Sequence, residues 1–301
     1  IDIDHADRLG DTIAEIATVK AGIIKDGAAV VSARQSPDAE AVLRRVAAEH
    51  GASIAFEGDE FALVEQRLAV GGQLITVRGL AATYPDEYLP LYGAHQGFNA
   101  TLAIAAVESL LGGGTRPITG DVLAEGLGQV TSPGRLQLIG AAPTVLVDAA
   151  HNPHGARALV AALRESFDFD EWGLVLGVLA GKDAHGILAA LAPAVTQVFA
   201  TAPDSERAVD ADAVADLVEA AGLPVTVHRD LAEAAEAARA WAAASDQAPH
   251  RRAVVIAGSV VLAGEAVALA AAEDWTHRRG DSGRRAGDDG SAPGEESGWD
   301  A

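Results

Sequence analysis

The feature that most constrains the fold is a regular alternation of short apolar runs and alanine-rich amphipathic stretches between residues 144 and 272. The apolar runs stand at 144–148, 174–179, 197–200, 225–228 and 253–257, and the amphipathic stretches at 156–165, 184–191, 211–221, 232–244 and 264–272. Repeated strand and helix predict a mostly parallel sheet covered by helices on both faces. Because such sheets bind ligands beyond the carboxyl ends of their strands, the residues after each strand are the functional candidates.

The first 130 residues are less regular. They predict helices at 13–21, 37–50 and 95–111, strands at 28–32 and 53–56, and a hairpin of 61–70 and 73–80 around Gly71-Gly72. Ser132-Pro133-Gly134 predicts a domain boundary. We therefore expect one domain at 1–131, a second at 132–275, and a disordered acidic tail at 276–301, where apolar periodicity is lost.

The composition narrows the class of protein. The 301 residues carry 43 acidic and 22 basic side chains, a formal charge of −21, which argues against nucleic acid or an anionic membrane as partner. The absence of cysteine excludes disulfides, thiolate metal sites and a cysteine nucleophile. No apolar run reaches the roughly 18 residues that span a bilayer. We expect a cytoplasmic monomer, and we interpret the chain, which starts at Ile1 and has no methionine, as a fragment.

His5 and Lys20 form the first candidate pair. His5 follows an apparent strand, where an imidazole can ligate a cation or contact a phosphate. Lys20 lies late in a helix in apolar company, and burial would favour its neutral amine, which can act as a nucleophile or form a Schiff base or carbamate. The alternative is a turn residue and a cation stabilised at a helix end.

Two further candidates flank the domain boundary. His95 and Asn99 are four residues apart near the start of a helix, and a carboxamide can bond to the N6/N7 edge of adenine. Arg135 follows a Pro-Gly turn, and its planar guanidinium suits phosphate oxygens. Helix capping and a surface salt bridge are the alternatives.

The strongest local signal is the segment 145–155. An apolar strand leads to Asp148, and His151 and Asn152-Pro153 stand between that strand and the next helix, where polar side chains are costly to desolvate without partners. Lys182 and Ser259 follow later strands, and backbone amides at a helix start attract anions, so Ser259 is a candidate for binding a carboxylate. An ordinary Gly-Ser turn is the alternative at that position.

In this order, the segments resemble the folylpolyglutamate synthases and the bifunctional dihydrofolate/folylpolyglutamate synthases, which are Mur ligases. The matching motifs are Ile3-Asp4-His5, Leu9-Gly10, Lys20-Ala21-Gly22-Ile23, His95-Gln96-x-x-Asn99-Ala100, Pro133-Gly134-Arg135 and Asp148-x-Ala150-His151-Asn152-Pro153-x-Gly155. The resemblance runs from residue 1 to about 266. It implies an α/β fold, in which the remainder of a P-loop Mur-ligase central domain precedes a Rossmann-like, mostly parallel C-terminal domain.

The resemblance also implies a reaction. ATP phosphorylates a carboxylate of dihydropteroate or a folate, and the amino group of L-glutamate then attacks the acyl phosphate. His5 would be a Mg²⁺ ligand, and Lys20 would carry a carbamate, an oxygen donor of the kind that Mg²⁺ prefers. Positioning and neutralisation of charge would provide most of the catalysis.

The same resemblance assigns the remaining candidates. Asn99 would contact adenine, Arg135 the phosphates and Asp148 the ribose side of ATP. His151 would lie near the phosphates or the incoming glutamate. The carboxylates of that glutamate would be bound by Ser259 and Lys182.

Three departures from the family pattern concern the metal and phosphate side. The glycine-rich phosphate loop and an upstream metal-binding glutamate are missing, and Gly181-Lys182 follows the wrong strand to replace the loop. Val19 stands where the family has glutamate, and Gly181 replaces an acidic residue. We therefore expect the 301-residue chain to be inactive by itself.

Three alternatives stay open at this point. A UDP-muramyl amino-acid ligase of peptidoglycan synthesis shares the segment around Asp148, although His95-Gln96 and the motif at Lys20 favour the folate branch. A non-catalytic nucleotide-binding paralogue would explain the missing loop and Val19. A simple flavodoxin-like domain would not explain the Pro-Gly-Arg segment.

Overall fold

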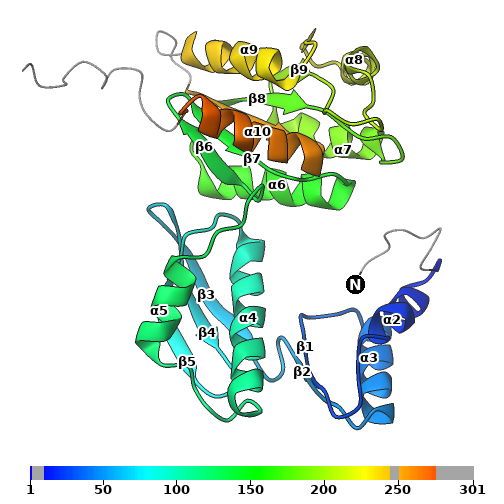
Figure 1. Ribbon diagram of the computed structural model, residues 1–301, viewed down its shortest axis with the longest axis vertical. Coiled ribbons are helices and arrows are strands. Elements are labelled where there is room, and N and C mark those ends of the chain that lie inside the picture. The colour runs from blue at the N-terminus through cyan, green and yellow to red at the C-terminus, as the bar shows by residue number, and fades with distance from the viewer. Residues whose placement is uncertain (2–9, 245–250, 276–301) are drawn as a thin grey trace, which may run out of the picture.

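A computed structural model describes residues 1, 10–244 and 251–275 of the chain. Two bodies follow one another along the sequence, joined by the segment around residues 130–136 (Figure 1). The first contains β1 to β5 with α2 to α5, and the second contains β6 to β11 with α6 to α10. Figure 1 shows α4 running from the first body up to the junction.

The chain begins with a small α/β unit. Helix α2 (Ile13–Ala21) starts at a capping box formed by Thr12 and Glu15, and α3 (Pro37–Glu49) starts at Ser36, whose hydroxyl accepts from Ala39 N. Strands β1 (Ala29–Ser32) and β2 (Ser53–Phe56) pair in parallel. The two helices and the strand pair bury a small apolar cluster of Ala21, Ile24, Leu43, Val46 and Phe56.

An antiparallel sheet completes the first body. Strands β3 (Ala62–Ala69), β4 (Gly72–Arg78) and β5 (Thr83–Leu89) follow one another in that order, and β3 pairs with β4 around the turn at Val70-Gly71. Helices α4 (Ala94–Gly112) and α5 (Gly120–Gly128) pack on this sheet. Helix α4 also contacts β1, so it lies between the two sheets of the first body (Figure 1).

The second body is a six-stranded sheet in the order β10-β9-β8-β11-β7-β6. All neighbours are parallel except β6 and β7. The strands are β6 (Gln137–Ala141), β7 (Thr144–Val147), β8 (Glu171–Leu176), β9 (Gln197–Ala200), β10 (Val225–Val227) and β11 (Arg252–Ala257).

Helices cover both faces of this sheet. Helices α6 (Pro153–Ser166), α7 (Ala184–Leu191) and α8 (Ala211–Ala220) share one apolar core, and α9 (Leu231–Ala243) and α10 (Val260–Ala272) share the other. A short 3-10 turn (Ala192–Ala194) follows α7. The apolar strands β8 and β11 lie in the middle of the sheet and are buried from both sides, which confirms the α/β class with a mostly parallel sheet.

Most predicted elements are confirmed, with three omissions and with shifted starts at α6, β8 and α10. Strands β5 and β6 and helix α5 were not predicted from the sequence. The strand predicted at 174–179 begins at Glu171 in the structure, as β8. A charged residue is tolerated there because the Glu171 carboxylate pairs across the sheet with Arg252 at 2.5 Å. The assignment of 1–131 and 132–275 to two domains stays a prediction, and the expected tail at 276–301 lies outside the described residues.

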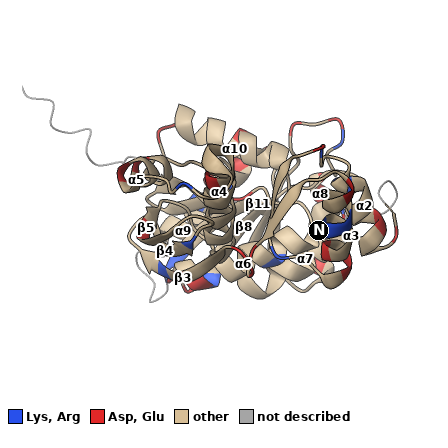
Figure 2. Cartoon of the chain, turned by 90° about the horizontal axis from the view of Figure 1, so that it is seen from below, with Lys and Arg blue, Asp and Glu red and all other residues tan. Residues whose placement is uncertain are grey.

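Acidic side chains outnumber basic ones over the whole chain, 43 to 22. In the described part of the chain, Lys and Arg residues are scattered among more numerous Asp and Glu residues (Figure 2). None of the described helices is long and apolar enough to cross a membrane.

Candidate functional site

The carboxyl ends of β7, β8 and β11 meet at one edge of the second sheet. The backbone N–H of Gly258, after β11, donates to the carbonyl of Ala150 at 3.0 Å, and Gly177, after β8, donates to Ala257 at 3.4 Å. The strands β7 and β8 lead to helices on one face, whereas β11 leads to α10 on the other. Loops that diverge in this way open a crevice at the sheet edge, which is where such folds bind ligands.

Asp148 follows β7 directly and is almost buried, with 7% of its surface exposed. Its Oδ2 accepts from Leu136 N and its Oδ1 from Ala150 N, both at 2.8 Å. Burial raises the pKa of Asp148, and these two bonds and the charges of Arg135 and His151 act against that rise. The predicted Asp148 is therefore a buried carboxylate, and each of its oxygens is bonded to backbone.

Arg135 stands in a tight turn between the two bodies. Its N–H donates to Ser132 O at 3.0 Å, and the neighbouring Gly134 has φ +69°. The guanidinium is exposed, and it makes no hydrogen bond or ion pair with any residue that the structure describes. In a chain with twice as many acidic as basic residues, a cation without a partner is available to an anionic ligand.

His95 and Asn99 lie at the start of α4, as the sequence predicts. Burial lowers the pKa of His95, and the positive charge of Arg135 lowers it further. The Nδ2 of Asn99 donates to Oε1 of Gln96 at 3.2 Å. Gln96 itself is buried, with 5% of its surface exposed.

Two more carboxamides fix the backbone that leads into α4. The buried Gln73 on β4 donates from Nε2 to Leu91 O at 2.9 Å and to Gly93 O at 3.4 Å. Gln66 on β3 donates to Gln73 and, at 3.3 Å, to Ala94 O. The antiparallel sheet thereby holds the helix start that carries His95 and Asn99.

His151 and Asn152 shape the loop between β7 and α6. Asn152 is the N-cap of α6, and its Oδ1 accepts from Gly155 N at 2.8 Å. The Nδ1 of His151 lies 2.9 Å from Ala149 O. Because a carbonyl oxygen only accepts, Nδ1 carries the hydrogen, and Nε2 is an acceptor in the neutral ring.

Lys182 and Ser259 occupy the same sheet edge. Ser259 is the N-cap of α10, is 1% exposed, and its Oγ accepts from Val261 N at 3.1 Å. Lys182 is half-buried and precedes Asp183, the N-cap of α7. A second cation that was not predicted from the sequence lies here: Arg207 donates to Ala180 O at 2.8 Å, which ties the loop after β9 to the loop before Lys182. Its place after a parallel strand was the available signal.

Of the two residues expected to hold Mg²⁺, His5 and Lys20, the structure describes only Lys20. Lys20 lies in the last turn of α2 and is exposed, so the prediction that apolar neighbours bury it is wrong; Val19 is 55% exposed and Ile23 82% exposed. His5 lies outside the described residues. Within residues 1, 10–244 and 251–275, no three His, Asp or Glu side chains gather closely enough to hold a metal ion.

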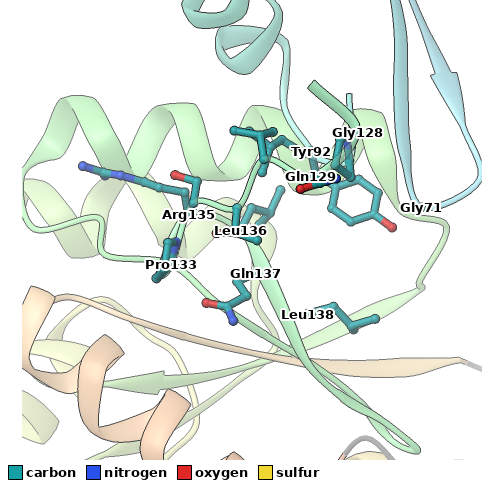
Figure 3. A pocket seen from close by; sticks show the side chains of 14 residues that line it. Gly71, Tyr92, Gly128, Gln129, Pro133, Arg135, Leu136, Gln137 and Leu138 are labelled. Atoms are coloured by element: carbon teal, nitrogen blue, oxygen red, sulfur yellow. The ribbon is translucent and has the colours of Figure 1, made fainter. Parts of the chain in front are cut away.

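The junction also contains a pocket of about 410 Å³ (Figure 3). It is lined by the linker into α4, the end of α5 and the segment 130–138. Figure 3 shows Leu136 and Tyr92 at its centre, and the side chain of Arg135 extending away from them. The Tyr92 ring packs on Phe167 of the second body, with ring centroids 4.8 Å apart.

Comparisons with known proteins agree with this architecture. Residues 134–260 match the family described as Mur ligase, glutamate ligase domain. The dihydrofolate synthase/folylpolyglutamate synthase of Mycobacterium tuberculosis is 44% identical over 285 residues, which cover 89% of this chain and 58% of that protein. The protein of the same name from Bacillus subtilis is 33% identical over 185 residues, covering 62% of this chain and 43% of that protein.

Solved structures show the same likeness. The folylpolyglutamate synthase of Mycobacterium tuberculosis complexed with ADP superposes with a TM-score of 0.83 at 43% identity, covering 90% of this chain and 62% of that one. An Escherichia coli protein in complex with DHPP and ADP gives a TM-score of 0.72 at 25% identity, covering 91% and 60%. The chain thus spans about three fifths of the length of these relatives.

Proposed function

Because the chain belongs to the folylpolyglutamate and dihydrofolate synthase family of Mur ligases, we propose that it acts as part of an ATP-dependent ligase and binds ATP at the junction of its two bodies. The ligase adds L-glutamate to a folate, and dihydropteroate is the second candidate acceptor. The single observation that carries the proposal is the turn between the two bodies, where the exposed Arg135 precedes Leu136, whose N–H is bonded to the buried Asp148 at 2.8 Å.

The described residues suit a nucleotide. Asn99 presents a carboxamide at the start of α4 for the adenine edge, and the unpaired Arg135 guanidinium suits phosphate oxygens. Asp148 lies next to the turn that carries this guanidinium, because its Oδ2 accepts from the N–H of Leu136. The complexes of relatives with ADP support this assignment, because those structures superpose over about nine tenths of this chain.

The remaining assignments concern the acceptor and donor sides. Lys182 and Ser259 are proposed to bind the carboxylates of glutamate, and Arg207 would add a second cation beside Gly181. His151 would contact the phosphates or the incoming amine through Nε2. Mg²⁺, held by His5 and a carbamylated Lys20, would neutralise phosphate charge; the exposed Lys20 amine is accessible to carbon dioxide.

The reaction needs two reactants held in one orientation. ATP transfers its terminal phosphoryl group to the folate carboxylate, the glutamate amine attacks the carbonyl carbon of the acyl phosphate, and inorganic phosphate leaves. Alignment of bound reactants can supply about 7–11 kcal/mol of the barrier reduction. Two bodies that close around the Arg135 turn would provide such alignment.

The test has two parts. Binding of ATP to the 301-residue chain is measured by calorimetry, with Arg135→Ala expected to weaken it. The full-length product of the gene that encodes this chain is then assayed for ATP-dependent addition of labelled glutamate to tetrahydrofolate and dihydropteroate, with UDP-muramyl peptides as the competing acceptors. Glutamate transfer to a UDP-muramyl acceptor alone would contradict the proposal.

A further inference from the structure

The turn that carries Arg135 is held from several sides by hydrogen bonds. The N–H of Gly134 donates to Oε1 of Gln137 at 3.0 Å, and the carbonyl of Gly134 accepts from Ala149 N at 2.6 Å. On the other side of Arg135, the N–H of Leu136 donates to Oδ2 of Asp148 at 2.8 Å. The backbone on both sides of the arginine is therefore bonded to the segment 148–149 that follows β7.

Leu136 has a backbone conformation that leucine rarely adopts. Its φ is +45°, in the left-handed region that costs an L-residue with a Cβ about 1–2 kcal/mol. The side chain is nonetheless buried in the core below the sheet, with 2% of its surface exposed. A strained residue persists where its surroundings fix it, and the carboxylate of Asp148 is the group that binds its N–H.

Asp148 has little remaining freedom to turn toward a ligand. Both of its oxygens already accept backbone hydrogen bonds, and the side chain is almost fully buried. The Arg135 guanidinium, in contrast, is exposed and unpaired among the described residues, and Figure 3 shows it extending away from the pocket at the junction. The buried carboxylate of Asp148 therefore holds the turn, and the exposed guanidinium of Arg135 is accessible to a ligand.

We propose that Asp148 is a positioning residue: by binding the N–H of the left-handed Leu136, it fixes the turn that aims Arg135 at the phosphates of the nucleotide. This inference rests on the proposed function, and it changes the role expected for Asp148, which the family resemblance places on the ribose. In the proposed arrangement, Asp148 acts on the phosphate side through Arg135.

The experiment is a double-mutant cycle with nucleotide affinity as the readout. Asp148→Asn, Arg135→Ala and the double variant are titrated with ATP, with adenosine and with 2′,3′-dideoxy-ATP. Each single variant is expected to bind ATP about ten- to hundredfold more weakly. The double variant should lose no more ATP affinity than the weaker-binding single variant loses, because the two residues act through the same contact.

The ligands separate a ribose contact from positioning. If Asp148 positions Arg135, Asp148→Asn leaves adenosine affinity unchanged within twofold and keeps the unaltered ratio between ATP and dideoxy-ATP. The inference would be overturned if the losses of ATP affinity multiply in the double variant and Asp148→Asn binds adenosine more weakly. That result would leave the proposed function standing. An unaltered chain that binds no adenine nucleotide would instead overturn both.

A second variant covers the case in which Asp148→Asn does not fold. Gln137→Ala removes the acceptor of the Gly134 N–H and loosens the same turn without touching the carboxylate. It should weaken ATP binding about two- to tenfold and spare adenosine. Unchanged ATP affinity in this variant would show that the turn does not aim Arg135. Circular dichroism and the unfolding midpoint establish that each tested variant is folded.

Discussion

Gln96 and Asn99 are linked by a hydrogen bond of 3.2 Å from Asn99 Nδ2 to Gln96 Oε1, one turn apart on α4. The bond fixes the directions in which the donor Nδ2 and the acceptor Oδ1 of the Asn99 carboxamide face. Adenine presents an acceptor at N7 and a donor at N6, so an amide of fixed orientation can bind both. A freely turning amide would lose that preference.

Replacing Gln96 with methionine tests this relationship. Gln96→Met keeps the shape of the buried side chain and removes the acceptor, so the affinity for ATP should fall about three- to tenfold. The preference for ATP over inosine triphosphate should narrow, because a freed Asn99 no longer places an acceptor opposite the purine substituent. Gln129→Met is the matched control, since the Gln129 amide bonds only to an exposed Glu125 at 3.4 Å. Equal ATP affinity of the unaltered chain and Gln96→Met would contradict the prediction.

A second prediction concerns the buried carboxylate of Glu108 on α4, which is fully buried. The phenol of Tyr84 donates to Glu108 Oε1 at 2.6 Å and accepts from Ile118 N at 2.8 Å. Burial, reinforced by this bond to Glu108, raises the pKa of Tyr84 to about 12, so the phenol keeps its proton at neutral pH. Tyr84 therefore connects β5, α4 and the loop before α5.

Tyr84→Phe should lower the free energy of unfolding by about 2–4 kcal/mol, because it leaves the carboxylate oxygen and the Ile118 N–H without that partner. Urea denaturation followed by circular dichroism measures the change. Tyr88→Phe is the control: its phenol is 38% exposed and bonds only to Val70 O, so the loss should stay within about 0.5 kcal/mol. Equal losses for the two variants would show that the buried position of the phenol is irrelevant.

The sequence predicted the second body well because its signal is periodic. Apolar strands and amphipathic helices alternate there, and the polar residues after β7, β8 and β11 mark the edge that the structure confirms. Strands β5 and β6 were missed for a physical reason. β5 is an edge strand that contains Pro85 and the charged Asp86 and Glu87, and β6 is antiparallel and starts next to the left-handed Leu136.

Candidate site residues could be named from their place along the chain, but roles that depend on contacts within the fold could not be predicted. Asp148, Arg135 and Asn99 could be named from their place after a strand, a turn or a helix start. Gln73 and Gln96 could not be given a role, because their partners lie in the fold, at Leu91 O and Asn99 Nδ2. The burial of Lys20 was predicted wrongly since apolar neighbours in sequence, Val19 and Ile23, are themselves exposed.

A third prediction tests the close contact of strand ends at the sheet edge. Gly258 has φ +113°, and a Cβ there would lie 2.6 Å from the carbonyl oxygen of Gly177. Gly258→Ala should destabilise the chain by about 2–4 kcal/mol through strain and overlap. Gly264→Ala, in the following helix with open space around it, should stabilise by about 0.5–1 kcal/mol. Thermal unfolding of both variants checks whether the two changes in stability have opposite signs. A loss of stability in both variants would refute the geometric explanation.

The last prediction concerns the charge that Arg135 exerts across the junction. Burial lowers the pKa of His95, and Arg135 lowers it further; burial alone lowers the pKa of His228. Arg135→Gln should therefore raise the pKa of His95 part of the way back toward 6.5 and leave His228 unchanged. Titration of the imidazole proton resonances by nuclear magnetic resonance measures both.

The same substitution predicts a change in acid stability with a definite sign. A histidine whose folded pKa lies below its unfolded value stabilises the fold above the unfolded pKa, and that stability is lost as pH falls through the folded pKa. Unfolding free energies should thus decline between pH 7 and pH 5 in the unaltered chain, and decline less in Arg135→Gln. If the two slopes agree, and the His95 resonance titrates alike in both proteins, the guanidinium does not reach His95. The proposal that His95 and Arg135 belong to one nucleotide site would then lose its electrostatic support.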